Sequence, residues 1–430
     1  MTTDVPTVTP AEAEPASGPA RPGRQFAKLW CASGASALGE GVTLAAAPLL
    51  ASRFTDDPRL IAGVSMALTL PYALFGIPAG VVVDRVDRRR TMARIDLFRG
   101  CLVAVFTLSL AAGLGSLWTL YVCLFLIGSC ETVFRNAAQT LVPAVVPENL
   151  LVTANGRIMG SEKVANQFVG PLVGSSLFVL AAALPFGVNA ATFFTSAFLL
   201  SRLRTRPDGE TRPGGETRPG GGGGARRLLT DMAAGLRWLF AHRVLRSLSL
   251  TAGAINVVYT GALAVLVVYA HRELGLSDVG YGVLVACQAV GAVAAAKLSP
   301  ALVRRVGHGW TLVWVGAAIG CSNLVMWLLP SVWAVGAALA VGACASVTWD
   351  IVAVVLRQTQ VPKELQGRVN SVYRLFAWGA LPVGAGLAGV VSKSQGTPAV
   401  YALGVGVMSL VTLWLAFGVR KWIKGASSDG

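Results

Sequence analysis

The chain has 430 residues, of which 54% are hydrophobic and only 13% are charged, whereas charged residues make up roughly 25% of a typical soluble domain. Too few charges remain to cover a water-soluble surface, and apolar stretches of about twenty residues recur along nearly the whole length. The composition therefore excludes soluble, disordered, collagen-like and disulfide-framework proteins and predicts an integral membrane protein.

Lys and Arg outnumber Asp and Glu by 36 to 21. Nucleic-acid binding would need these charges on a water-facing domain, and no segment is long enough to form one, so no nucleic-acid partner is expected. The seven cysteines form no CxxC pair and lie in apolar segments, which predicts neither a metal site nor a disulfide nor a cofactor. Residues 1–25 lack the short apolar core of a cleavable signal, so the first span is expected to start insertion itself.

A hydropathy window of about 19 residues predicts twelve membrane spans. We expect helices, because the alternating ten-residue strands of a membrane barrel are absent. The predicted spans are 28–51, 60–83, 92–114, 118–141, 153–181, 183–203, 244–270, 278–301, 310–330, 332–356, 368–391 and 398–420.

The basic residues predict the orientation. With both termini cytoplasmic, every Lys and Arg falls in or beside a cytoplasmic segment except Arg53, Arg59, Arg272 and Lys393. Because cytoplasmic loops of membrane proteins are enriched in these residues, we expect a multi-pass protein of the cell membrane with both termini inside.

The chain is predicted to divide into two helical bundles, at 28–203 and 243–420. They are preceded by a disordered cytoplasmic segment (1–27) and followed by a cytoplasmic tail (421–430). Between them, residues 204–242 contain the repeated hexapeptide GETRPG and four consecutive glycines, a composition typical of a flexible linker. Its end, 226–240, carries leucines on one side of a basic helix, which we expect to lie on the membrane surface.

The two bundles resemble each other. Three landmarks recur in the same order at offsets of about 210 to 220 residues, which predicts two parallel repeats of six helices with a substrate site between them at mid-membrane depth. These are GVVVDRVDRR at 80–89 with LVRRVG at 302–307, Arg135 and Pro147 with Arg357 and Pro362, and Gly170, Pro171 and Gly174 with Pro382 and Gly384.

The segment from Gly80 to Arg90 resembles the loop signature of the major facilitator superfamily. SALGEG at 36–41, the run from Pro147 to Pro171, and VPKELQGRVNSV at 361–372 are similar to its drug-exporter branch with twelve spans, which includes macrolide and siderophore exporters. Two positions depart from the pattern: Asp87 stands where the superfamily often has glycine, and Arg304 where the second copy would have aspartate.

The first loop is interpreted as a cytoplasmic gate. Its glycine permits a close helix approach, its aspartate can complement a helix dipole, and its arginines can pair across the cytoplasmic mouth. The alternative is that the arginines only fix the topology. The gate residues are Gly80, Asp84, Arg85, Arg88 and Arg89.

Acidic residues inside the spans each cost about 2.5–3.5 kcal/mol on insertion scales and therefore call for a reason. Four have a basic residue within reach: Asp96 with Arg99, Glu131 with Arg135, Glu162 with Lys163, and Asp350 with Arg374. For Glu131 and Asp350, the sequence leaves open whether the pair is structural or functional.

Glu40 is interpreted differently. It lies about 18 Å deep, and no basic residue is expected at that depth. The sequence thus predicts an unpaired carboxyl that couples transport to protons, with Glu131, Arg135 and Asp350 as secondary candidates. The alternative is a protonated Glu40 that only hydrogen-bonds a neighbouring helix.

The resemblance implies that the first, fourth, seventh and tenth helices line the cavity. Asn256, Tyr259, Gln288 and Trp349 are the predicted substrate contacts. The glycines and prolines at Gly170, Pro171, Gly174, Pro382 and Gly384 are predicted to kink helices or to let them pack closely.

These features together predict a monomer that exports a small amphipathic or cationic compound, such as a drug, antibiotic or siderophore, in exchange for protons. The alternatives are proton-coupled uptake and transport of a lipid-like molecule. A membrane-embedded transferase is disfavoured because His242, His271 and His308 stand apart, and the absence of a Walker loop excludes ATP as the energy source. No enzymatic activity is expected.

Overall fold

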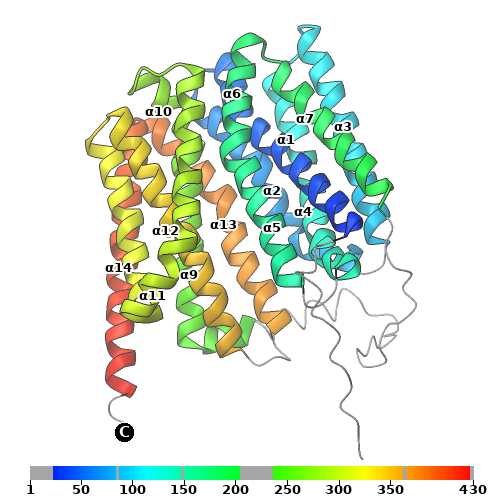
Figure 1. Ribbon diagram of the computed structural model, residues 1–430. Coiled ribbons are helices and arrows are strands. Elements are labelled where there is room, and N and C mark those ends of the chain that lie inside the picture. The colour runs from blue at the N-terminus through cyan, green and yellow to red at the C-terminus, as the bar shows by residue number, and fades with distance from the viewer. Residues whose placement is uncertain (1–22, 84–86, 147–149, 204–235, 362–365, 427–430) are drawn as a thin grey trace, which may run out of the picture.

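The computed structural model describes residues 23–83, 87–146, 150–203, 236–361 and 366–426, which form a bundle of helices with no strand among them (Figure 1). The first half contains α1 (Arg24–Phe54), α2 (Pro58–Val83), α3 (Arg88–Ala111), α4 (Leu117–Val145), α5 (Leu151–Val164), the π-helix η2 (Ala165–Val169), α6 (Gly170–Leu180) and α7 (Leu184–Ser201). The second contains α9 (Arg243–Ala264), α10 (Leu266–Arg272), α11 (Asp278–Leu328), α12 (Val332–Gln360), α13 (Gln366–Gln395) and α14 (Thr397–Ala426).

Every predicted span overlaps one or more of these helices. The span at 153–181 consists of α5, η2 and α6, and that at 244–270 of α9 and α10. Helix α11 contains two predicted spans, whose arms meet at Gly307 with a φ of 77°, a conformation that glycine adopts readily because it lacks Cβ. Helix α14 continues to Ala426, beyond the predicted end at residue 420.

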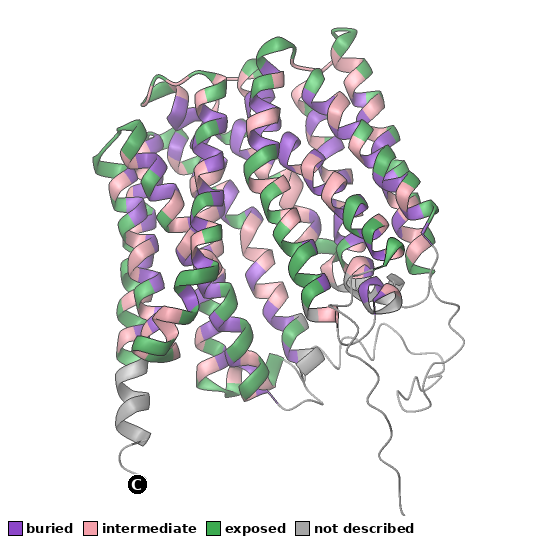
Figure 2. Cartoon of the chain, viewed as in Figure 1, coloured by how far each residue is buried: buried purple, intermediate pink, exposed green. Residues whose placement is uncertain are grey.

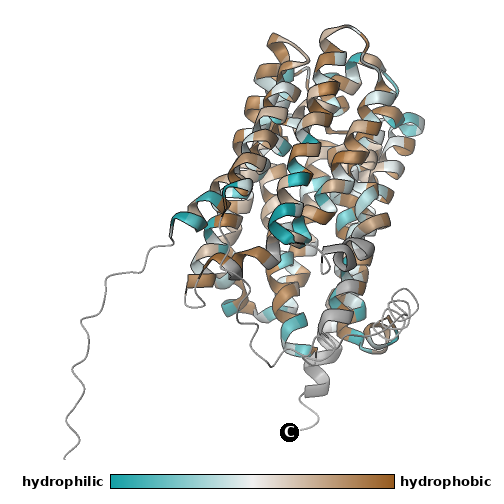
Figure 3. Ribbon diagram, turned by 90° about the vertical axis from the view of Figure 1, so that its right-hand side faces the viewer, coloured by the Kyte–Doolittle hydropathy of each residue, from teal (hydrophilic) through white to brown (hydrophobic). Residues whose placement is uncertain are grey.

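The outer face of the bundle is apolar along its length. Among the described helices, nine are long and apolar enough to cross a membrane. Large apolar side chains such as Leu108, Leu180 and Trp333 point outward, with exposed fractions of 70%, 75% and 88%. Exposed positions run along the whole bundle in Figure 2, and apolar ribbon covers most of it in Figure 3. A surface of this kind is stable against acyl chains and not against water.

The helices pack mainly within each half of the chain. In the first half α1 packs on α6 and α7, and α3 on α7; in the second, α11 packs on α12 and α14, and α9 on α13. The halves meet chiefly where α2 contacts α13 and where α6 and η2 contact α11. This arrangement agrees with the predicted all-helical architecture of two repeats.

A pair of close helix crossings repeats between the halves. A Cβ at Gly174 of α6 would lie 2.4 Å from the carbonyl oxygen of Val42, and a Cβ at Gly384 of α13 would lie 2.3 Å from that of Val257. Only glycine permits either approach. The predicted packing residues thus hold α6 against α1 and α13 against α9 in corresponding ways.

Ion pairs join the halves at the end of the bundle opposite the termini. Arg53 lies 3.7 Å from Asp278, Arg272 lies 3.9 Å from Asp56, and Lys393 lies 3.5 Å from Asp57. Asp57 also pairs with Arg59 at 2.8 Å. The four basic residues assigned to the outer side by the sequence therefore all contact aspartates at this end.

Candidate functional site

A cluster of charged side chains is buried in the first half, between α1, α3 and α4. At its centre lies Arg99, which is fully buried and packs between the rings of Phe134 and Phe193, each centred 5.2 Å from its guanidinium carbon. Its guanidinium contacts the carboxylates of Asp96 at 3.3 Å and Glu131 at 2.5 Å. The aromatic rings exclude water from this arginine, so its charge must be balanced by the carboxylates.

A second arginine completes the cluster. Arg135 pairs with Glu131 one turn before it on α4, and its side chain is half exposed. The hydroxyl of Ser196 on α7 donates to Asp96 at 2.6 Å. The cluster therefore contains three carboxylates and two guanidinium groups.

The third carboxylate belongs to Glu40, and the expectation that it lacks a counter-charge is wrong. Arg99 lies 3.6 Å and Arg135 3.8 Å from its oxygens. Helix α3 begins at Arg88, four residues before the predicted span, so Arg99 lies about 17 Å along it. The length of the arginine side chain then brings the guanidinium to Glu40 on another helix.

A cavity of about 220 Å³ lies on the inner side of the second half. Three of the predicted substrate contacts, Asn256, Tyr259 and Trp349, line it together with Asp350. Other lining side chains were not predicted, because they are single polar or aromatic residues within apolar helices. They include Lys163, Gln167, Ser346, Tyr373 and Trp378.

The predicted pair between Asp350 and Arg374 is also wrong. Arg374 lies over the ring of Trp378 instead, with its guanidinium carbon 4.2 Å from the ring centre. Asp350 makes no ion pair with any residue in the described ranges, although Lys163 from the first half lines the same cavity. The two residues have similar depths on successive helices, but depth does not determine the direction in which a side chain points.

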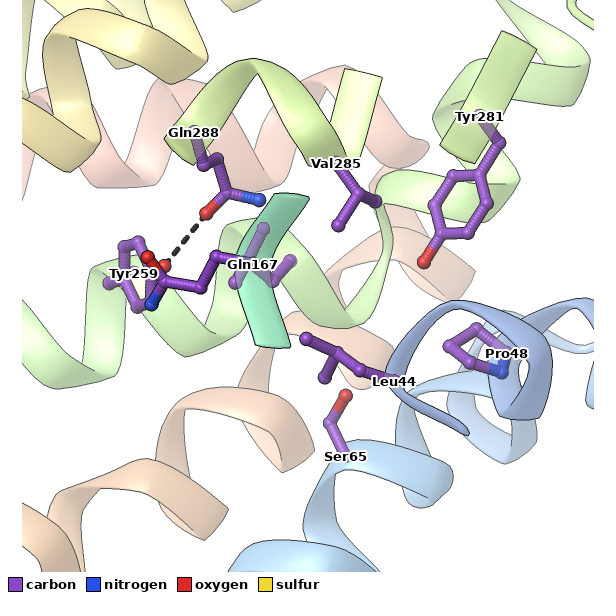
Figure 4. A pocket seen from close by; sticks show the side chains of 9 residues that line it. Leu44, Pro48, Ser65, Gln167, Tyr259, Tyr281, Val285 and Gln288 are labelled. Atoms are coloured by element: carbon purple, nitrogen blue, oxygen red, sulfur yellow. Dashed lines mark hydrogen bonds between the residues drawn. The ribbon is translucent and has the colours of Figure 1, made fainter. Parts of the chain in front are cut away.

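A smaller cavity of about 60 Å³ lies beyond the first (Figure 4). Gln288, the remaining predicted contact, lines it and accepts a hydrogen bond of 2.7 Å from the Tyr259 hydroxyl. Tyr259 and Gln167 border both cavities. The two spaces are therefore contiguous at these side chains.

The segment predicted as a gate is described only in part. Asp84 and Arg85 lie outside the described residues, and Gly80 lies in the last turn of α2. Arg88 and Arg89 begin α3, and Arg89 donates to the carbonyl oxygen of Leu203 at 2.6 Å. Asp87, the departure from the family pattern, accepts a hydrogen bond from the backbone N–H of Arg90 and so caps α3.

Gly170 and Pro171, where a kink is predicted, directly follow the π-helical turn η2 and begin α6. The N–H of Gly170 bonds to the carbonyl of Ala165, five residues earlier. Proline has no N–H and its ring collides with the carbonyl four residues before it, and the wider turn relieves this collision. In the second half, Pro382 lies inside α13.

Within the described ranges, no group of three or more His, Cys, Asp or Glu side chains is arranged to hold a metal ion. The acidic side chains of the buried cluster are directed at arginines instead. Carboxyl groups at these sites are able to bind protons, and the polar and aromatic side chains of the cavities are able to contact a ligand.

A family model described as a transmembrane secretion effector of the major facilitator superfamily matches residues 17–428. The chain belongs to this family. The multidrug efflux pump Tap of Mycobacterium tuberculosis is 26% identical over 375 residues, which cover 85% of this chain and 86% of Tap. Macrolide efflux protein A of Streptococcus pyogenes is 28% identical over 155 residues, covering 36% and 38% of the two chains.

Solved structures of transporters share the fold. The nucleoside transporter NupG superposes with a TM-score of 0.71 at 12% identity, covering 92% of this chain and 98% of that one. A bacterial homologue of the iron transporter ferroportin gives 0.68 at 15% identity, covering 91% and 98%. The protein is thus a membrane transporter of the major facilitator type with drug-efflux relatives.

Proposed function

We propose that this protein exports small amphipathic or cationic compounds across the cell membrane in exchange for protons. Relatives named as drug efflux pumps support the direction of transport. The concentration of basic residues near the termini supports an orientation with that end in the cytoplasm.

The imbalance of the buried cluster carries the proposal of proton coupling. Three carboxylates share two guanidinium groups, so full ionisation leaves one uncompensated negative charge within the membrane. Such a charge is costly in a low-dielectric interior. Binding one proton removes it, and losing that proton restores it.

Glu40 is the carboxyl group assigned to this proton. Its side chain is 18% exposed, whereas those of Asp96 and Glu131 are 0% and 8% exposed. Its contacts with arginine, at 3.6 and 3.8 Å, are also the longest in the cluster. The proposed proton binding by Glu40 therefore rests on its solvent exposure and its long ion-pair distances, and not on the lack of a counter-charge.

The larger cavity is the proposed substrate site. Asp350 is its one acidic lining residue, and Trp349, Tyr373 and Trp378 supply aromatic surface. A carboxylate beside aromatic rings favours an organic cation, because the charge and the ring faces both attract it. In this conformation ion pairs join the halves at the opposite end, which supports entry of the substrate from the end with the termini.

Ethidium accumulation in proteoliposomes tests this function. We expect an imposed pH gradient to drive accumulation by the wild type, and Glu40→Gln to abolish it while retaining downhill ethidium exchange. Glu273→Gln is the control, because this acid is exposed at the end of α10, outside the cluster, and makes no ion pair among the described residues. Full gradient-driven accumulation by Glu40→Gln across about pH 6 to 8 would contradict the assignment.

A further inference from the structure

The two cavities differ in chemistry on either side of Gln167 and Tyr259. The larger one contains the charged groups of Asp350 and Lys163. The smaller one is lined mainly by apolar and aromatic side chains, with Ser65 and Gln288 as the added polar groups. Its lining residues are Leu44, Pro48, Ser65, Gln167, Tyr259, Leu263, Tyr281, Val285 and Gln288.

Gln167 reaches this boundary from the π-helical turn. It is the third of the five residues of η2, between the α-helical segments α5 and α6. The bond from Gly170 to Ala165 adds one residue to the turn, which rotates the side chains of η2 relative to those of a continuous α-helix. Figure 4 shows Gln167 beside Tyr259 and Gln288, on the opposite half of the protein.

The Gln167 amide has no hydrogen-bond partner among the described side chains and backbone groups. Its polar neighbours do: Tyr259 donates to Gln288 at 2.7 Å, and Asn256 donates to the Ala377 carbonyl at 2.7 Å. An amide that lines both cavities and has no partner can donate to or accept from a ligand there, and such a hydrogen bond favours binding.

We propose that Gln167 determines substrate specificity by hydrogen bonding to the part of the substrate that crosses between the two cavities. The substrate class is an amphiphile with a cationic group near Asp350, an apolar end in the smaller cavity, and a hydrogen-bonding group between them. This inference rests on the proposed function, because it requires that the cavities bind the transported compound.

Two organic cations test this inference by titration calorimetry on the protein in nanodiscs. Ethidium carries two aromatic amines that can hydrogen-bond, whereas tetraphenylphosphonium has no hydrogen-bonding group. For Gln167→Leu we expect the ethidium Kd to rise roughly 5- to 10-fold, as for the loss of one hydrogen bond. The tetraphenylphosphonium Kd should change by less than about 2-fold, and this retained binding also reports correct folding.

Asp350→Asn separates the inference from the function on which it rests. This variant should weaken both cations alike, because both need the carboxylate. If Asp350→Asn weakens both but Gln167→Leu changes neither, or both equally, the role of Gln167 is overturned and the substrate site stands. If the wild type binds neither cation, or Asp350→Asn changes neither Kd, the proposed site itself is overturned.

Pro171→Ala tests the presentation of Gln167 by the π-turn. It restores a backbone N–H and removes the ring, so a regular α-helix becomes accessible and the Gln167 side chain would rotate away. We expect the same selective loss of ethidium affinity without any change at residue 167. Retention of the full preference for ethidium in Pro171→Ala would overturn this part of the inference.

Discussion

The two halves share an architecture and differ in their charges. The first half gathers three carboxylates and two arginines in one paired cluster. The second half places one acidic residue, Asp350, in an open cavity without an ion pair in the described ranges. Yet Gly174 and Gly384 make corresponding helix crossings. Related packing therefore does not impose related chemistry, and a division between proton binding and substrate binding can arise within one repeat architecture.

The largest expected effect comes from removing the central cation. Arg99→Met leaves Asp96 without an ion pair in the described ranges and leaves Glu40 and Glu131 to share Arg135. Breaking a buried ionic network by removing one partner typically costs about 3–5 kcal/mol. We expect a marked fall in the thermal unfolding temperature of the purified protein. Arg374→Met is the matched control, because that arginine lies over the Trp378 ring, makes no ion pair in the described ranges and should cost much less.

The double variant Arg99→Met with Glu131→Gln tests whether charge balance stabilises the cluster of the first half. It removes one charge of each sign, and we expect it to recover part of the stability lost in Arg99→Met alone. Equal stability of the single and double variants would show that Arg99 acts by packing between its aromatic rings and not by neutralising carboxylates.

Glu40→Gln should alter proton coupling and leave substrate binding nearly unchanged, whereas Asp350→Asn should alter substrate binding and leave coupling unchanged. The first should change the pH dependence of transport with ethidium affinity within about 2-fold of the wild type. The second should weaken ethidium binding roughly 10-fold, as for a lost charge-assisted contact, with the pH dependence retained. Transport rates and Kd values measured between about pH 6 and 8 would distinguish them, and identical profiles would contradict the division between the halves.

A moderate effect is expected from the ion pairs opposite the termini. Each exposed pair contributes about 0.2–1 kcal/mol, so Arg53→Glu, which reverses one charge beside Asp278, should shift the balance of conformations several-fold. In a cysteine-free background, Ser65→Cys in the smaller cavity would report this shift. We expect faster labelling by an impermeant maleimide added from that end, and unchanged labelling would contradict a closing role for the pairs.

The smallest effect concerns pH at this same end. The hydrogen bond from the Arg59 side chain lowers the pKa of Asp57 below its usual range. The ion pairs of Asp57 therefore contribute fully to folding stability above the unfolded-state pKa of about 3.9. This contribution is lost as the pH falls through the lower pKa of the folded state. Asp57→Asn should therefore change the transport rate without altering its pH profile between about pH 5 and 8. A changed profile would place a proton site here.

The order and approximate positions of the helices follow from the sequence, because hydrophobic length and internal satisfaction of backbone hydrogen bonds are local properties. The acidic residues that need partners are also evident from the sequence, and the pairs Asp96 with Arg99 and Glu131 with Arg135 lie within one helical turn. Local spacing suffices for such contacts.

The charges that meet across helices could be found only from the packed bundle. Glu40 faces Arg99 and Arg135 from other helices, and Asp350 lies apart from Arg374, because helix rotation and side-chain length set such contacts and hydropathy records neither. The boundary position of Gln167 depends on a π-turn between α5 and α6 and on its contact with the second half. The helical elements are thus local properties of the sequence, whereas packing between distant segments forms the sites.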